Sequence, residues 1–131
     1  MATPTPVTTV WTLGTRTCVS WQGIWAATDN FATEVVVDLS TLTGYTSALR
    51  IKKIQMSCSP GIAADLTLNQ ATDAIVASCA LGCTFVSYTY DGHPQGGPTA
   101  PSSGTGDLML ATRSAASGDE IFIYVECETV T

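Results

Sequence analysis

Apolar and polar residues alternate in several short segments of the chain, most clearly between residues 120 and 128. Successive side chains of an extended strand point to opposite faces, so every second residue shares one face. In this segment the shared apolar face holds Ile121, Ile123, Val125 and Cys127. The same alternation occurs at 65–69 and 107–112, and clusters of Gly, Pro, Asn, Asp and Ser separate the segments. Such spacing predicts an antiparallel sandwich or barrel rather than alternating strands and helices.

The remaining strands are predicted from weaker patterns. Candidate segments lie at 7–13, 16–21, 35–37, 49–58, 74–79 and 83–90, which brings the total to eight or nine strands. The chain also contains 21 threonines, and this β-branched residue suits a half-exposed strand better than a helix. A helix over 71–81 is an alternative, because Ala and Leu favour helices. We therefore predict an all-β, two-sheet antiparallel β-sandwich that forms one domain over residues 1–131, a length sufficient for one core.

Two segments depart from simple alternation. Between 49 and 58, the apolar residues occupy odd positions up to Ile51 and even positions from Ile54. The slip at 52–53 predicts a β-bulge, and we expect deletion of one of these two lysines to turn half of the strand outward. The segment 35–37 is three valines with no polar residue, which predicts a strand covered on both faces.

The second face of the segment 120–128 mixes aromatic and acidic side chains. Its members are Glu120, Phe122, Tyr124, Glu126 and Glu128. Charged groups on an outward strand face are usually solvated. This face is therefore predicted to be a half-solvated outer surface or the floor of a contact site.

Three tryptophans, Trp11, Trp21 and Trp25, lie within the first quarter of the chain. One interpretation is that one or two of them anchor the core, because an indole ring buries a large area. The other is that at least one lies in a protein contact, where Trp is enriched.

The sequence offers no constellation of groups for catalysis. Its single histidine is His93, so any catalytic triad would have to include it. His93 lies in the Gly- and Pro-rich segment 91–106, which predicts a long loop. No GxSxG, HExxH or P-loop motif is present, and no GxGxxG follows a strand. We predict no catalytic residues, no cofactor-binding residues, no cofactor and no enzymatic activity.

The chain has five cysteines, Cys18, Cys58, Cys79, Cys83 and Cys127, with no CxxC spacing. Their odd number and the expected cytosolic synthesis predict reduced thiols that behave as small buried hydrophobes. A partial zinc set of Cys79, Cys83 and His93 falls short of four ligands, so no metal-binding residues are predicted.

The net charge of −6 disfavours contact with phosphate backbones and anionic lipids. Three cationic residues, Arg50, Lys52 and Lys53, share one predicted strand, a pattern typical of a solvated or edge-guarding strand. The N-terminus lacks the basic and apolar regions of a secretory signal, and no apolar run reaches the ~18 residues of a membrane span. We therefore expect no nucleic-acid or membrane partner and synthesis in the cytoplasm.

Five segments in a fixed order resemble a family of small proteins encoded beside the major capsid protein of tailed bacteriophages. The segments are Val37-Asp-Leu-Ser40, Leu66-Thr-Leu-Asn-Gln-Ala-Thr-Asp73, Gly96-Gly-Pro98, Gly106-Asp-Leu-Met-Leu-Ala-Thr112 and Ser117-Gly-Asp-Glu-Ile-Phe-Ile-Tyr-Val125, within 35–128. These proteins are regarded as head decoration, or cement, proteins with a jelly-roll-like sandwich. The chain departs from the family pattern at Asn69, where the family usually has a Trp.

The resemblance implies a viral structural protein without enzymatic activity. It implies binding to the assembled major capsid protein, as a homo-oligomer on the outer capsid surface of the virion. An acidic surface suits this role, because it keeps unbound copies apart in solution. The alternative is a receptor- or carbohydrate-binding β-sandwich, such as a phage fibre tip or a lectin-like module, with Trp21 and Trp25 as a platform for a sugar ring.

Overall fold

The structure is a computed structural model that describes residues 7–13, 16–26, 28, 30–31, 34–38, 48–68, 74–82, 84–90 and 107–130. The predicted loop at 91–106, which contains His93, and Cys83 lie outside the described residues.

The described residues form nine strands. They are β1 (Val7–Leu13), β2 (Arg16–Ile24), β3 (Glu34–Val37), β4 (Ala48–Cys58), β5 (Ala63–Leu68), β6 (Ala74–Cys79), β7 (Phe85–Thr89), β8 (Leu108–Arg113) and β9 (Glu120–Val130). Each predicted strand is present within a few residues of its expected bounds.

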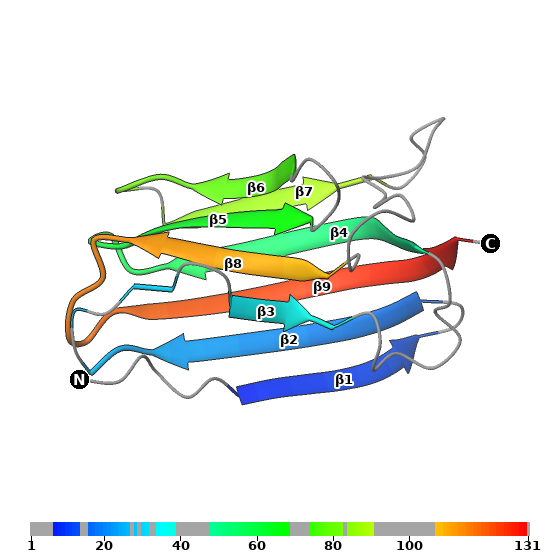
Figure 1. Cartoon of the computed structure of the whole chain (residues 1–131), viewed down its shortest axis with the longest axis horizontal. Helices are drawn as coiled ribbons and strands as arrows, with labels where there is room; N and C mark the ends of the chain where they lie inside the picture. Colours follow the sequence, from blue (N-terminus) through cyan, green and yellow to red (C-terminus); the bar gives the residue numbers. More distant parts are fainter. Residues whose placement is uncertain are drawn as a thin grey trace.

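The strands form two antiparallel sheets that pack face to face (Figure 1). One sheet has the order β1-β2-β9-β4-β7 and the other has the order β3-β8-β5-β6. The pairs β2·β9, β3·β8, β4·β7 and β5·β6 are all antiparallel. From β2 to β9 the chain is thus one long hairpin whose successive strand pairs alternate between the sheets, which is the arrangement of a jelly roll. The predicted antiparallel β-sandwich is confirmed, with β1 added beside β2.

The core lies between the sheets, where the alternating apolar residues meet. Fully buried members from the five-stranded sheet include Ile121, Ile123, Val125 and Cys127, and those facing them from the four-stranded sheet include Leu66, Leu68, Leu108 and Leu110. Both sets are the residues that the period-two pattern assigned to the inside. Burial of such side chains contributes about 1.5–3 kcal/mol each, so this core is the main source of stability.

One end of the core is aromatic. Phe31 packs edge-to-face on Trp21 and Trp25, with ring centroids 6.1 and 5.5 Å apart respectively. Its backbone is held at β8, where the Phe31 amide donates to Thr112 Oγ1 at 2.9 Å and the Thr112 amide donates to the Phe31 carbonyl at 2.9 Å. The segment at residues 30–31 therefore closes this end of the sandwich.

The phase slip in β4 is a β-bulge, as predicted. Ile51 pairs with Cys127 and Lys53 pairs with Glu126, so Lys52 is the extra residue. The expected effect of deleting a lysine is wrong, however. Without Lys52 the two flanking pairs would follow each other in a regular ladder, and both halves of the strand would keep their apolar residues inward.

The prediction that the valines of β3 are covered on both faces is also wrong. Val36 and Val37 are buried, but Val35 is 40% exposed. Val35 pairs with Met109 and Val37 pairs with Leu108, so Val36 is the extra residue of a second bulge. The bulge turns two successive valines inward, which explains an uninterrupted apolar run without a second covering layer.

The segment 74–79 is strand β6, paired with β5, so the alternative of a helix at 71–81 is wrong for the residues described. Within the described ranges there is no helix, and hence none that is long and apolar enough to cross a membrane.

Candidate contact surface

The five-stranded sheet turns one face to the core and the other away from it. We call the second face the outer face. On the central strands its residues alternate with those of the buried inner face, and on β9 they run from exposed Glu120 to partly exposed Glu128. The outer face has an apolar half near the start of β9 and a charged half near its end.

The apolar half is organised around one straight row of residues, which we call the aromatic row. It takes one residue from each strand of the sheet, and its members in order are Val7, Gln22, Phe122, Ser57 and Phe85. All five are exposed, with 46% of Phe122 and 56% of Phe85 accessible. Apolar and polar side chains thus alternate along a line across the full width of the sheet.

A hollow of about 190 Å³ lies beside the aromatic row, against Ser59 and Glu120. The Glu120 amide donates to Ser59 Oγ at 2.9 Å, and the Ser59 amide donates to the Glu120 carbonyl at 3.0 Å. These two bonds fix the hollow's wall. Ile24, the residue paired with Glu120, adds another exposed aliphatic group at the same end. A ligand in this hollow would meet apolar surface with hydroxyl, amide and carboxylate groups nearby.

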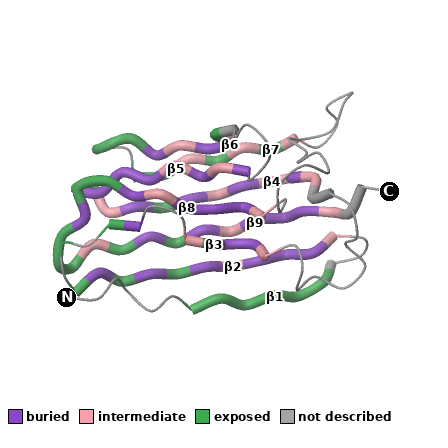
Figure 2. Tube along the Cα trace, in the orientation of Figure 1, coloured by how far each residue is buried: buried purple, intermediate pink, exposed green. Residues whose placement is uncertain are grey.

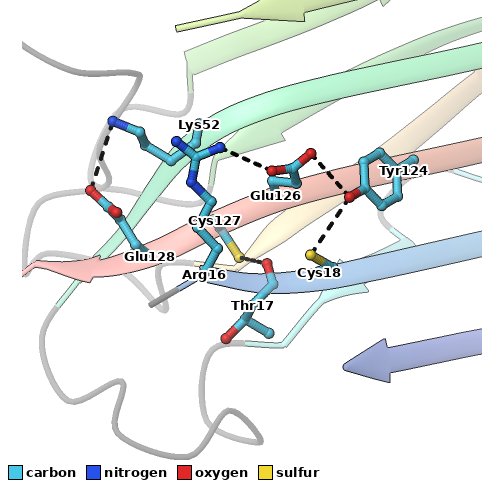
Figure 3. A network of polar contacts seen from close by, with 8 residues as sticks. All are labelled: Arg16, Thr17, Cys18, Lys52, Tyr124, Glu126, Cys127 and Glu128. Atoms are coloured by element: carbon cyan, nitrogen blue, oxygen red, sulfur yellow. Dashed lines mark hydrogen bonds and ion pairs between the residues drawn. The ribbon is translucent and has the colours of Figure 1, made fainter. Parts of the chain in front are cut away.

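The charged half contains a network of polar contacts centred on Glu126 (Figure 3). Arg16 Nη1 lies 3.0 Å from one carboxylate oxygen of Glu126, and the Tyr124 hydroxyl donates to the other at 3.0 Å. The prediction that Glu126 is a solvated acid is wrong, since the residue is only 8% exposed. A buried carboxylate needs such partners, because an isolated charge in the same place would be strongly destabilising.

Tyr124 connects this network to Trp11. The two rings stack with centroids 5.8 Å apart and planes at 28°, and Cys18, opposite Trp11 in the sheet, is fully buried. Burial, followed by hydrogen bonds to Cys18 and Glu126, raises the pKa of Tyr124 far above its ordinary value. At neutral pH the phenol is therefore a neutral hydrogen-bond donor.

The cationic residues of β4 face acids of β9. Arg50 Nη1 and Lys52 Nζ lie 3.9 and 3.8 Å from the same oxygen of Glu128. Part of the positive charge of this strand is thus balanced within the sheet.

The three tryptophans differ in burial, and a protein contact for any of them stays a prediction. Trp21 and Trp25 are buried, which confirms the core interpretation for them, whereas Trp11 is 41% exposed on the outer face. The predicted sugar platform of Trp21 and Trp25 is therefore wrong. Alternation identified Phe122 as outward-facing, but the row that joins it to Phe85 depends on strand order, which is not visible in local sequence.

Four of the five cysteines, Cys18, Cys58, Cys79 and Cys127, are buried, as predicted for small hydrophobes. Over the part of the chain that the structure describes, no group of three or more His, Cys, Asp or Glu side chains could hold a metal ion. That the cysteines are reduced stays a prediction.

No protein-family model matches the sequence, and no curated protein matches it. Among solved structures, the chain is similar to one from the virus-like particle of the extra small virus of the giant freshwater prawn Macrobrachium rosenbergii. That match has 16% identity and a TM-score of 0.36 and covers 97% of this chain and 88% of the other. The chain is also similar to the N-terminal cellulose-binding domain of β-1,4-glucanase C from Cellulomonas fimi, with 13% identity, a TM-score of 0.33, and 93% and 83% of the two chains covered. Similarities of this strength indicate no function.

Proposed function

We propose that this protein is a bacteriophage capsid decoration protein that binds and stabilises the assembled major-capsid lattice and has no enzymatic activity. The observation that carries the proposal is the aromatic row on the outer face. The row exposes two phenylalanines and a valine on one face of the sheet, and aromatic residues are enriched in protein interfaces.

The resemblance to head decoration proteins supports the same role. The resembling segments Gly106–Thr112 and Ser117–Val125 include most of β8 and the first half of β9, where Phe122 lies. We propose that copies sit as a homo-oligomer on the outer capsid surface of the virion after synthesis in the host cytoplasm. Each contact is weak, but several linked contacts on a repeating lattice raise the overall affinity by roughly a hundredfold or more.

The test uses undecorated capsids assembled from the proposed partner, the major capsid protein. Purified protein is mixed with these capsids, with unassembled capsid subunits and with a glycan array, and bound protein is measured by sedimentation or fluorescence. We expect binding to assembled capsids in a fixed ratio, weak binding to subunits, and capsids that resist heating better. Binding to glycans and not to capsids would assign the protein to the carbohydrate-binding class instead.

Two variants locate the surface. Phe122→Ser and Phe85→Ser each remove one exposed ring of the aromatic row, and we expect capsid affinity to fall roughly tenfold or more. Ile75→Ser is the matched control, because Ile75 is 65% exposed but lies on β6 in the other sheet. Unchanged capsid binding by both row variants would exclude the outer face as the binding surface.

A further inference from the structure

Each sheet of the sandwich ends in two edge strands, which carry unpaired backbone groups able to pair with another chain. The four edges are β1, β7, β3 and β6. Proteins usually protect such edges by keeping them short, by placing charges on them or by introducing bulges.

Three of the four edges show such protection. β3 has four residues, begins with Glu34 and carries the bulge at Val36. β6 has an extra residue at Val76, because Leu66 pairs with Ala77 and Thr67 pairs with Ile75. β7 has only five residues. These edges offer short or irregular ladders to a second chain.

Edge β1 is different. It has seven residues, pairs with β2 without any register shift, and contains no charged residue, Gly or Pro. Residues 7–12 are all exposed, as Figure 2 shows along the length of the strand. Among the edges that the structure describes, it is the one that is both long and regular.

Strand β1 also extends beyond the sheet that faces it. A groove of about 250 Å³ lies between β1 and β3, lined by Val10, Val19 and Val35 among others, and Val10 is 52% exposed. In Figure 1, β1 lies beyond β3 at the margin of the sandwich. Among the described residues, no strand of the other sheet covers the inner-face side chains of β1 as the four-stranded sheet covers those of β2.

The sequence of β1, Val-Thr-Thr-Val-Trp-Thr-Leu, is partly symmetric about Val10, with Thr at both 8 and 12 and an aliphatic residue at both 7 and 13. An antiparallel pair of two copies centred there places Val10 opposite Val10, Thr8 opposite Thr12, and Thr9 opposite Trp11. In each of these pairs the two residue numbers differ by an even number. Because the N–H and C=O groups of every second residue point to the same edge of a strand, groups that point away from β2 on one copy meet such groups on the other copy. The pairs are Val with Val, Thr with Thr, and Trp with the β-branched Thr, which are favourable cross-strand combinations, and no like charges meet.

We propose that two copies of this chain pair through β1 in an antiparallel, two-fold symmetric dimer that joins their five-stranded sheets into one continuous sheet. The same patch serves both subunits, as in the isologous interfaces that are the commonest among oligomers. This pairing does not depend on the capsid role, because it is measured on the protein alone. An interface of one strand is small, so we expect a dissociation constant on the order of 1–100 µM.

The central position makes a charge-exchange test possible. Val10→Lys places two positive charges opposite each other across the symmetry axis, and Val10→Glu places two negative charges there. Sedimentation equilibrium of the wild type should show dimers, each variant alone should dissociate at least roughly tenfold more readily, and a mixture of the two should form heterodimers. Ile75→Lys, a charge added to an exposed position of edge β6, should leave the dimer intact.

A second variant tests the pairing without placing a charge at position 10, where a charge could disturb folding. Val10→Cys keeps a small apolar side chain, and mild oxidation should link two copies through this position, because directly opposed residues lie within reach of a disulfide. Ile75→Cys and the wild type should remain unlinked. A wild type that stays monomeric at millimolar concentration, a V10K and V10E mixture that stays monomeric, or absence of V10C cross-linking would each overturn the proposal.

Discussion

The two faces of the five-stranded sheet differ in burial, although neighbouring residues of each strand lie on opposite faces. Trp21, Ile123 and Met56 form a cross-strand row on the inner face and are fully buried. The next positions, Gln22, Phe122 and Ser57, belong to the aromatic row and are exposed. Apolar side chains therefore have different tasks on the two faces. Those inside stabilise the fold, and those outside contribute little to it and remain available for binding.

The largest effect is expected from Trp21→Ala, on the inner face. Removing this fully buried ring leaves a cavity and should lower the free energy of unfolding by about 3–5 kcal/mol. Phe122→Ala, on the outer face, should cost about 1 kcal/mol or less. Urea denaturation followed by circular dichroism measures both, and equal losses would contradict the difference between the faces.

Gly23→Ala tests how tightly the inner face is packed. A Cβ at Gly23 would lie 2.8 Å from Trp21 Cη2 and 3.2 Å from Trp25 Cζ3, and both rings are buried and unable to retreat freely. We expect a loss of about 1–3 kcal/mol from overpacking. Gly61→Ala is the matched control, because its Cβ would meet only Asp119 oxygens at ordinary contact distances of 3.7 and 4.0 Å. If both variants had the same melting temperature as the parent, the close approach at Gly23 would be refuted.

Tyr124→Phe tests the network on the outer face. It removes the hydrogen bond to Glu126 and should cost about 1 kcal/mol at pH 7. The pKa of Tyr124 is raised in the folded chain, so the wild type keeps its full stability below the unfolded-state pKa of about 10 and loses it as the pH rises further. The variant should lose less stability between pH 9 and 11, as seen in denaturation curves at each pH. A parallel decline in both proteins would show that another group causes it.

The smallest effect is expected from deletion of Lys52. The bulge would close into a regular ladder with Ile51 and Lys53 in their present pairs. The ion pair with Glu128 is lost, which is worth about 1 kcal/mol or less at a surface site. Deletion of Ile51 serves as the contrasting variant, because it removes a fully buried side chain and should destabilise the fold by several kcal/mol. A large loss on deletion of Lys52 would mean that the bulge itself is needed for the twist of β4.

The sequence predicted the strands because burial on one face leaves a period of two that can be read locally. Ile121 to Cys127 and the leucines of β5 and β8 obey this period, and all of them are buried. The bulge at 52–53 was also predicted, because the apolar residues change there from odd to even positions. The bulge in β3 was not, because three consecutive valines are compatible both with a doubly covered strand and with a bulge that turns two of them inward.

Local sequence therefore determined which segments are strands and which of their side chains face the core, because these depend on neighbours along the chain. Strand order was decided by the tertiary structure alone, because it depends on contacts between residues far apart in sequence. Phe85 and Phe122 are 37 positions apart, yet both flank Ser57 in one row, and Arg16 meets Glu126 across 110 positions. The aromatic row, the buried carboxylate of Glu126 and the long, regular edge β1 exist only once the described strands have been placed in two sheets.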